Sequence, residues 1–242
     1  MNKFISSGFI LLLLLSLASC GGKKFTKNPV DIIIKDIPTD QVFSVVLNDM
    51  DVEGSFFKTY KHEYKVIQER EVGKPEEYSA GWYEVDKRTF ERHINDMGME
   101  IASRGEDGKL MKGVNPPGYN NYVGNTKYGQ WENRGGTSFW VFYGQYSFMR
   151  SMFHLGAYPV HRSYYNNYRT TYYGTGRGYY GPTVSGRSYY GTNSAYNSST
   201  RPNSSWSRNN SSFKRRVTSR TSRSGSRYGG TSSRSRGGGF GK

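Results

Sequence analysis

Hydrophobic positions between residues 30 and 113 recur over short spans, most of which alternate with polar positions. Alternation with a period of two is typical of strands that bury one face. The expected strands cover residues 31–37, 43–48, 56–68 and 81–85. In the longest of them, one face carries Phe56, Tyr60, His62, Tyr64 and Val66. A loop around Pro75 is expected over residues 73–79.

One amphipathic helix is expected after these strands, over residues 86–104. Its apolar stripe has helical spacing and comprises Phe90, Ile94, Met97 and Ile101. Asp86 is suited to cap the first turn, and Gly105 is suited to follow the last turn. Residues 30–113 therefore predict a small α+β domain, in which one helix packs on a small antiparallel sheet.

Glycine and aromatic residues dominate residues 114–161, which follow the predicted domain. Within them, residues 139–155 are compatible with a helix that is apolar nearly all round. Such a helix must pack against another surface, so this segment is a candidate site for a protein partner.

Residues 162–242 consist mainly of glycine, serine, tyrosine, asparagine and arginine. Aliphatic side chains are supplied only by Val184, Ala195 and Val217. This composition predicts a long disordered tail, because too little apolar surface is available to offset the entropy of ordering the chain.

The formal net charge of +15 is concentrated in this tail, which holds 15 lysines and arginines and no acidic residue. Residues 1–161 hold 19 basic and 19 acidic residues and are neutral overall. This one-sided distribution suggests two regions with different roles.

The N-terminus has the pattern of a lipoprotein signal. Lys3 precedes an apolar run over residues 9–15 that is too short to span a bilayer. Leu17-Ala18-Ser19-Cys20 resembles the lipobox of bacterial lipoproteins. The resemblance implies a signal peptide over residues 1–19, acylation of Cys20 and a lipidated tether over residues 20–29.

The same resemblance implies a location in the bacterial cell envelope, anchored outside the cytoplasm. Because Gly21 stands where aspartate marks inner-membrane retention, it also implies the outer membrane if the source has one. The alternative is an ordinary secretory signal with an incidental cysteine. Cys20 is the one cysteine in the chain, so no internal disulfide is expected.

Arginine outnumbers lysine 13 to 2 in the tail, and its fork binds phosphate and carboxylate in a bidentate way. The candidate polyanion-binding residues are Arg162, Arg169, Arg177, Arg187, Arg201, Arg208, Lys214, Arg215, Arg216, Arg220, Arg223, Arg227, Arg234 and Arg236. The expected partners are anionic lipid, lipopolysaccharide or a wall polymer, whereas the lipobox argues against nucleic acid. A solvated or self-associating linker is the alternative.

Motifs for metal binding or catalysis are incomplete. Residues 49–54 resemble the start of an EF-hand loop, but Tyr60 stands where the bidentate glutamate belongs, which favours a polar turn. Residues 176–181 match G-x-G-x-x-G without a preceding strand. The four histidines lack metal-ligand spacing, so no metal or cofactor is expected.

These observations favour a non-enzymatic, membrane-anchored lipoprotein that acts as a binding or structural module. The alternative is an enzyme or accessory subunit with an unrecognised site in residues 30–160. A pocket on which His62, His93 or carboxylates converge would favour that alternative.

Overall fold

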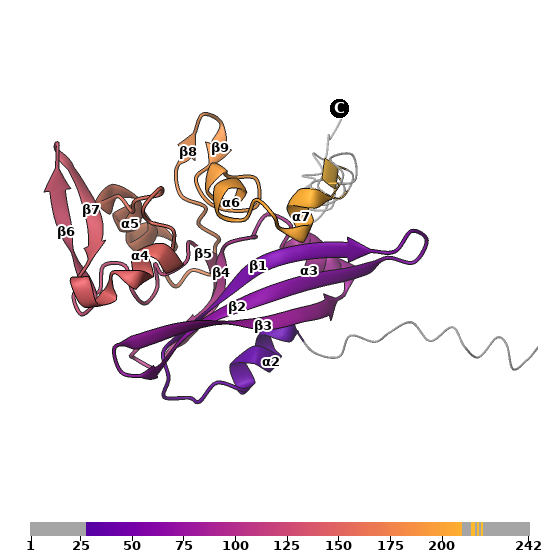
Figure 1. The fold of residues 1–242 in the computed structure, drawn as a ribbon, viewed down its shortest axis with the longest axis horizontal. Helices are drawn as coiled ribbons and strands as arrows, with labels where there is room; N and C mark the ends of the chain where they lie inside the picture. The colour runs from indigo at the N-terminus through magenta and orange to yellow at the C-terminus, as the bar shows by residue number, and fades with distance from the viewer. Residues whose placement is uncertain (1–27, 210–213, 216, 218, 220–242) are drawn as a thin grey trace, which may run out of the picture.

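The computed structural model describes residues 28–209, 214, 215, 217 and 219. The fold is α+β, and its centre is a five-stranded antiparallel sheet in the order β3-β2-β1-β4-β5 (Figure 1). The strands are β1 (Phe43–Glu53), β2 (Thr59–Glu71), β3 (Lys74–Val85), β4 (Glu100–Arg104) and β5 (Leu110–Asn115). The strands expected at 43–48, 56–68 and 81–85 are confirmed in β1, β2 and β3. The second strand begins at Thr59 and ends at Glu71, three residues later than expected at each end.

The loop expected over residues 73–79 is wrong, because β3 already begins at Lys74. Glu71 pairs with Lys74, which leaves a turn of only Val72 and Gly73. Gly73 has a φ of +78°, which this tight turn requires. Pro75 is tolerated because β3 is an edge strand, where a missing N–H leaves no ladder bond unmade.

A helix, α2 (Pro29–Lys35), replaces the strand expected over residues 31–37. The Asn28 side chain accepts a hydrogen bond from the Val30 N–H at 3.1 Å, and Pro29 occupies the first turn. These start signals outweigh the strand preference of the β-branched run. Val30, Ile33 and Ile34 are buried at helical spacing.

The helix expected over residues 86–104 is wrong beyond its first turns, since α3 covers only Lys87–Arg92. Asp86 caps it as expected. Gly98 has a φ of +81°, and residues 100–104 form β4, which pairs with β1. All four residues of the expected stripe are buried nevertheless: Phe90 from α3, Ile94 and Met97 from the turns that follow it, and Ile101 from β4 reach the same core.

Both faces of the sheet are covered, so residues 43–47 of β1 are buried one after another. On one face Phe43, Val45 and Leu47 join a cluster with α2 and α3. On the other face Val46 joins a cluster of aromatic side chains from the second half of the chain. Figure 1 shows α2 below the sheet and the later elements above it. This continuous burial explains why Val46 breaks the alternation of β1.

Residues 129–152 form a hairpin followed by short helices, and the helix expected over residues 139–155 is wrong. The elements are β6 (Gly129–Arg134), β7 (Thr137–Phe142), the 3-10 turn η2 (Gly144–Tyr146) and α4 (Phe148–Met152). Residues 137–142 form a strand instead of a helix. The cross-strand pair of Trp140 on β7 and Trp131 on β6, with ring centroids 5.2 Å apart, stabilises this hairpin.

The disorder expected from residue 162 onward is wrong for residues 162–209, which pack on the sheet. Their elements are α5 (Arg162–Asn167), the π-helical turn η3 (Tyr168–Tyr172), β8 (Thr183–Val184), β9 (Arg187–Ser188), α6 (Ala195–Thr200) and α7 (Ser205–Arg208). Tyrosine supplies the apolar surface that aliphatic residues lack: Tyr168, Tyr179, Tyr190 and Tyr196 are buried.

A buried polar network ties this region to the sheet. Glu100 of β4 is fully buried, and its Oε1 accepts a hydrogen bond from Asn120 Nδ2 at 2.5 Å. The Tyr168 hydroxyl donates to Asn120 Oδ1. Burial raises the pKa of Glu100 to about 7.

The predicted signal peptide, Cys20, the predicted tether up to Lys27 and most of residues 210–242 lie outside the described residues. Among the helices that the structure describes, none is long and apolar enough to cross a membrane.

A polar cleft as the candidate binding site

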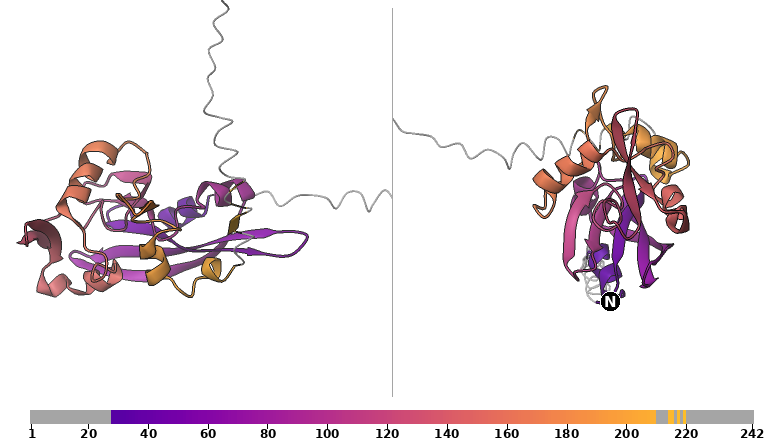
Figure 2. Two further views of the ribbon diagram at one scale, coloured as in Figure 1. Left: turned by 90° about the horizontal axis from the view of Figure 1, so that it is seen from above. Right: turned by 90° about the vertical axis from the view of Figure 1, so that its left-hand side faces the viewer.

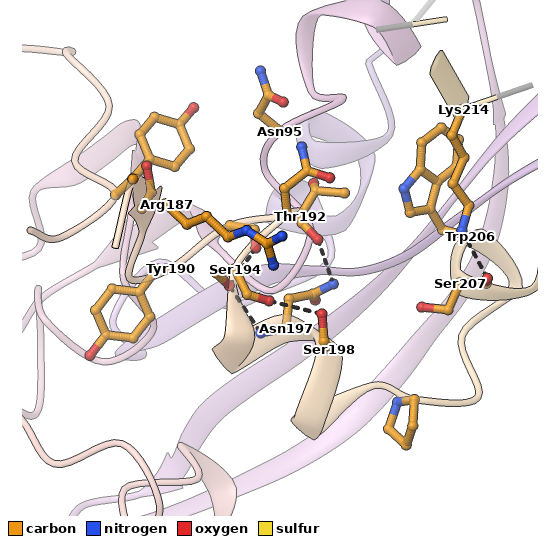
Figure 3. A pocket seen from close by; sticks show the side chains of 16 residues that line it. Asn95, Arg187, Tyr190, Thr192, Ser194, Asn197, Ser198, Trp206, Ser207 and Lys214 are labelled. Carbon is orange, nitrogen blue, oxygen red and sulfur yellow. Dashed lines mark hydrogen bonds between the residues drawn. The ribbon is translucent and has the colours of Figure 1, made fainter. Parts of the chain in front are cut away.

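A cleft of about 1020 Å³ lies where β8, β9, α6 and α7 meet the loop that follows α3 (Figure 3). Its amides come from Asn95, Asn193 and Asn197. Its hydroxyls come from Ser188, Thr192, Ser194, Ser198 and Ser207. Its aromatic side chains are Tyr180, Tyr190 and Trp206. The wall is thus polar and interleaved with rings.

Hydrogen bonds to the loop after α3 fix one wall of the cleft. The Thr192 N–H donates to the Asn95 carbonyl at 3.0 Å, and the Met97 N–H donates to Thr192 Oγ1 at 3.0 Å. Gly191 has a φ of +93°, and a Cβ there would lie 2.6 Å from the Asn95 carbonyl oxygen. Only glycine therefore allows this close approach.

Hydrogen bonds at the start of α6 hold this wall of the cleft together. Ser194 Oγ accepts from the Asn197 N–H at 3.0 Å, and Asn197 Nδ2 donates to the Thr192 carbonyl at 3.1 Å. Asn197 is 2% exposed, and its Oδ1 has no hydrogen-bond partner among the described residues. This oxygen is itself buried beside Gly98, so a molecule in the cleft does not reach it.

Asp49 of β1 positions the opposite wall. Its carboxylate accepts hydrogen bonds from the Ser205 N–H at 2.5 Å and the Trp206 N–H at 3.2 Å, and so caps α7. Trp206 is buried, with its ring centroid 5.9 Å from that of Phe90. The EF-hand-like run is therefore structural, and the described residues contain no cluster of three metal-binding side chains.

The cleft is positively charged. Its described lining includes Arg187 and Lys214 and no acidic residue. Arg187 is exposed and extends from β9 over the cleft, towards Ser194 in the view of Figure 3. Lys214 Nζ donates to the Ser207 carbonyl at 2.8 Å, and burial lowers its pKa. The two cations stand at different sides of a hydroxyl- and amide-lined surface.

The structure distributes the other candidate cations over the surface and does not gather them into the cleft. Guanidinium groups lie over aromatic rings: Arg162 over Trp131 at 5.8 Å, Arg169 over Tyr173 at 3.6 Å and Arg177 over Tyr172 at 5.2 Å. Arg201, Arg208 and Arg215 do not line the cleft. Arg201 Nε donates to Asn48 Oδ1 at 3.3 Å, and Arg208 Nη2 donates to Ser205 Oγ at 3.3 Å. Outside the described residues lie Arg216, Arg220, Arg223, Arg227, Arg234 and Arg236.

The histidines named by the enzyme alternative do converge, but below the surface. The rings of His62 and His93 have centroids 6.0 Å apart, and His93 Nδ1 lies 2.7 Å from an Asp96 carboxylate oxygen. Burial lowers the pKa of His62 to about 3, so the ring is neutral. The Tyr180 hydroxyl donates to Asp96 at 2.5 Å. Neither histidine lines the polar cleft or the three other cavities described around residues 109–177, 134–159 and 147–200.

A smaller, apolar cavity of about 330 Å³ lies on the 139–155 segment, between β7 and α4. Phe139, Phe142 and Leu155 contribute to its lining, with Arg150 at its edge. A protein partner on this segment stays a prediction.

Sequence reasoning missed most of the cleft, because nearly all of its residues lie in the region expected to be disordered. The available signal was local: Ser194 and Ser204 have the spacing and chemistry of helix N-caps, and both cap helices here. The recurring Tyr-Tyr-Gly triplets also place Gly191 directly after two buried or half-buried rings. Searches of known family models, curated proteins and solved structures found no match to this chain.

Proposed function

We propose that this protein is a binding module of the bacterial cell envelope, anchored through acylated Cys20, and that its polar cleft binds an anionic polymer rich in hydroxyl groups. Two separate observations support this proposal. The anchor rests on the lipobox resemblance of residues 17–20. The binding activity rests on the cleft.

The observation that carries the binding proposal is the chemistry of the cleft lining. Two cations and no acidic residue suit a carboxylate or phosphate group, and the arginine fork can hold either one in a bidentate way. The amides and hydroxyls suit the hydroxyl groups of a sugar or polyol backbone. Together these features favour an acidic glycan or a phosphorylated wall polymer.

The remaining cations would add a weaker, non-specific attraction. Six of the seven described candidate arginines do not line the cleft, so their contribution depends on summed charge and falls as salt shortens the Debye length. The cleft contacts should survive moderate salt better, since the charges there are joined to directional hydrogen bonds.

The enzyme alternative has less support. His62 and His93 lie close together, but His62 is fully buried and its Nδ1 is 3.0 Å from the Tyr64 hydroxyl. A substrate would need a cavity at these rings, and the described cavities lie elsewhere. The two histidines and Asp96 instead join α3 to the sheet.

The test is binding of the chain to polygalacturonate, with neutral dextran as the uncharged comparison. Replacing both cleft cations, Arg187→Gln and Lys214→Gln, should weaken binding at least tenfold, because charge-assisted hydrogen bonds contribute about 1.5–3 kcal/mol each. The matched control, Arg162→Gln with Arg177→Gln, removes the same charge outside the cleft and should change binding less than threefold. Equal losses in the two variants would show that summed charge alone binds the polymer.

The anchor is tested separately with Cys20→Ser. The variant should take up no labelled fatty acid and should leave the membrane fraction. Continued labelling of the variant would contradict acylation at Cys20.

A further inference from the structure

Two phenylalanines stand almost fully in solvent at the tip of the β1–β2 hairpin. Phe56 is 97% exposed and Phe57 is 93% exposed, although alternation predicted Phe56 on the buried face of a strand. Residues 53–58 are all exposed. Figure 1 and the left view of Figure 2 show this hairpin extending beyond the elements around it.

The tip has a defined conformation that presents these rings. Gly54 has a φ of +86°, and a Cβ at this position would lie 2.1 Å from the Phe57 carbonyl oxygen. The Lys58 ammonium lies 3.4 Å from the Gly54 carbonyl oxygen. Beside the tip, Lys61 and Glu53 form an ion pair at 2.7 Å. Adjacent exposed rings on a built turn indicate a contact surface, since apolar side chains gain free energy when they leave water.

The expected tether decides which surface can reach these rings. Seven residues lie between Cys20 and Asn28, where the described chain begins, and the eight Cα–Cα steps from Cys20 to Asn28 span at most about 28 Å when extended. The 13 residues of β2 span about 44 Å, so the tether is shorter than the sheet. The anchored domain therefore stays close to the bilayer.

The start of α2, where the tether joins the described chain, faces the side of the hairpin tip. In Figure 1, α2 runs beneath the sheet with its first residues towards the hairpin tip and its last residues towards the opposite end. Val72, in the β2–β3 turn, is at that opposite end and is 88% exposed. The cation Lys58 next to Phe57 also suits a bilayer whose headgroups are anionic.

We propose that Phe56 and Phe57 insert into the interfacial layer of the membrane that holds Cys20, and that they fix the domain's orientation on that membrane. This inference rests on the lipid anchor of the proposed function. Aromatic and apolar side chains at an interface enter to a depth of about 5–10 Å, near the boundary between headgroups and acyl chains. The cleft then faces a defined direction, and the domain does not tumble on its tether.

The experiment uses the full chain, acylated in bacteria and reconstituted into vesicles of phosphatidylethanolamine and phosphatidylglycerol. Acylation consumes the thiol of Cys20, so Ser55→Cys supplies a single site for an environment-sensitive fluorophore beside both rings. Val72→Cys is the matched site at the other end of β2. Mass spectrometry of the N-terminal peptide reports the acyl chains independently.

The label at residue 55 should show blue-shifted emission and at least twofold quenching by lipids that carry a nitroxide on the upper acyl chain. The label at residue 72 should show neither. Adding Phe56→Ser and Phe57→Ser should abolish both signals at residue 55 while the N-terminal peptide stays acylated.

An acylated chain whose label at residue 55 behaves like the label at residue 72 would overturn the inference and leave the anchor standing. Insertion of the tip in a chain without acyl chains would support the inference and refute the anchor. A blue shift without lipid quenching, accompanied by energy transfer between labelled copies, would also overturn it, because the tips would then pair with each other.

Discussion

Replacing Glu100 by glutamine should change how the stability of the fold depends on pH. Glu100 is fully buried on β4, and burial raises its pKa from 4.5 to about 7. Since the folded-state pKa is the higher one, the folded protein binds the proton more tightly than the unfolded chain. The stabilisation is therefore complete below pH 4.5 and is lost as the pH rises to about 7.

The magnitude follows from that interval. At about 1.4 kcal/mol per pH unit, the rise from 4.5 to 7 corresponds to a loss of about 3 kcal/mol. His62 acts in the opposite direction, because burial lowers its pKa from 6.5 to about 3 and stability is lost as the pH falls through that range. The two effects oppose each other between pH 4.5 and 6.5. Of these two effects, only that of His62 remains in Glu100→Gln.

The assay is urea unfolding between pH 4.5 and 8, followed by tryptophan fluorescence in a chain that starts at Gly21. The free energy of unfolding of the wild type, minus that of Glu100→Gln, should fall by about 3 kcal/mol between pH 4.5 and 7. The control Glu76→Gln alters an exposed carboxylate on β3 and should give a curve nearly parallel to the wild type. Parallel curves for Glu100→Gln as well would refute the burial of Glu100.

Three further predictions concern packing. Ile94→Ala should destabilise the fold by about 2–5 kcal/mol in urea unfolding, because it deletes a buried side chain, whereas Arg88→Ala on the exposed face of α3 should change little; similar losses would contradict this core. Gly191→Ala should lower the free energy of unfolding by about 1–3 kcal/mol and weaken polymer binding, since a Cβ there meets the Asn95 carbonyl oxygen. Unchanged stability and binding would contradict the close approach of Gly191 to Asn95 in the cleft wall. Limited trypsin digestion should leave a resistant fragment that extends to about Arg208, and rapid cleavage at residue 162 would restore the expectation of a disordered tail.

Periodicity predicted the sheet better than it predicted the helices. Alternation located β2, because residues 61–66 alternate between half-buried and buried positions and carry that signal locally, whereas β1 was located although both of its faces are buried. The 86–104 segment misled because Phe90, Ile94, Met97 and Ile101 have helical spacing. Residues 100–104 instead form β4, which pairs with β1 across a sequence separation of about 55–60 residues. No local pattern contains that information.

The order of residues 162–209 could not be predicted from composition alone. The sequence has almost no aliphatic side chains there, which is the usual sign of disorder. Tyrosines replace them: the Tyr190 ring packs edge-on against Tyr119 at 6.0 Å and Tyr196 at 5.1 Å. Tyr119 belongs to a segment 70 residues earlier, so the burial depends on the tertiary fold. The cleft could not be predicted for the same reason, because its walls form only when these tyrosines pack on the rest of the fold.

Hydrogen–deuterium exchange of the acylated chain, with and without a polygalacturonate oligomer, tests whether the cleft binds an anionic polymer. Exchange should be slower in residues 187–198 and 205–208, which form the cleft walls, and unchanged in the β6–β7 hairpin. The neutral dextran oligomer should leave all of these segments unchanged. Slower exchange that spares the cleft walls, or that appears equally with dextran, would contradict an anion-binding cleft.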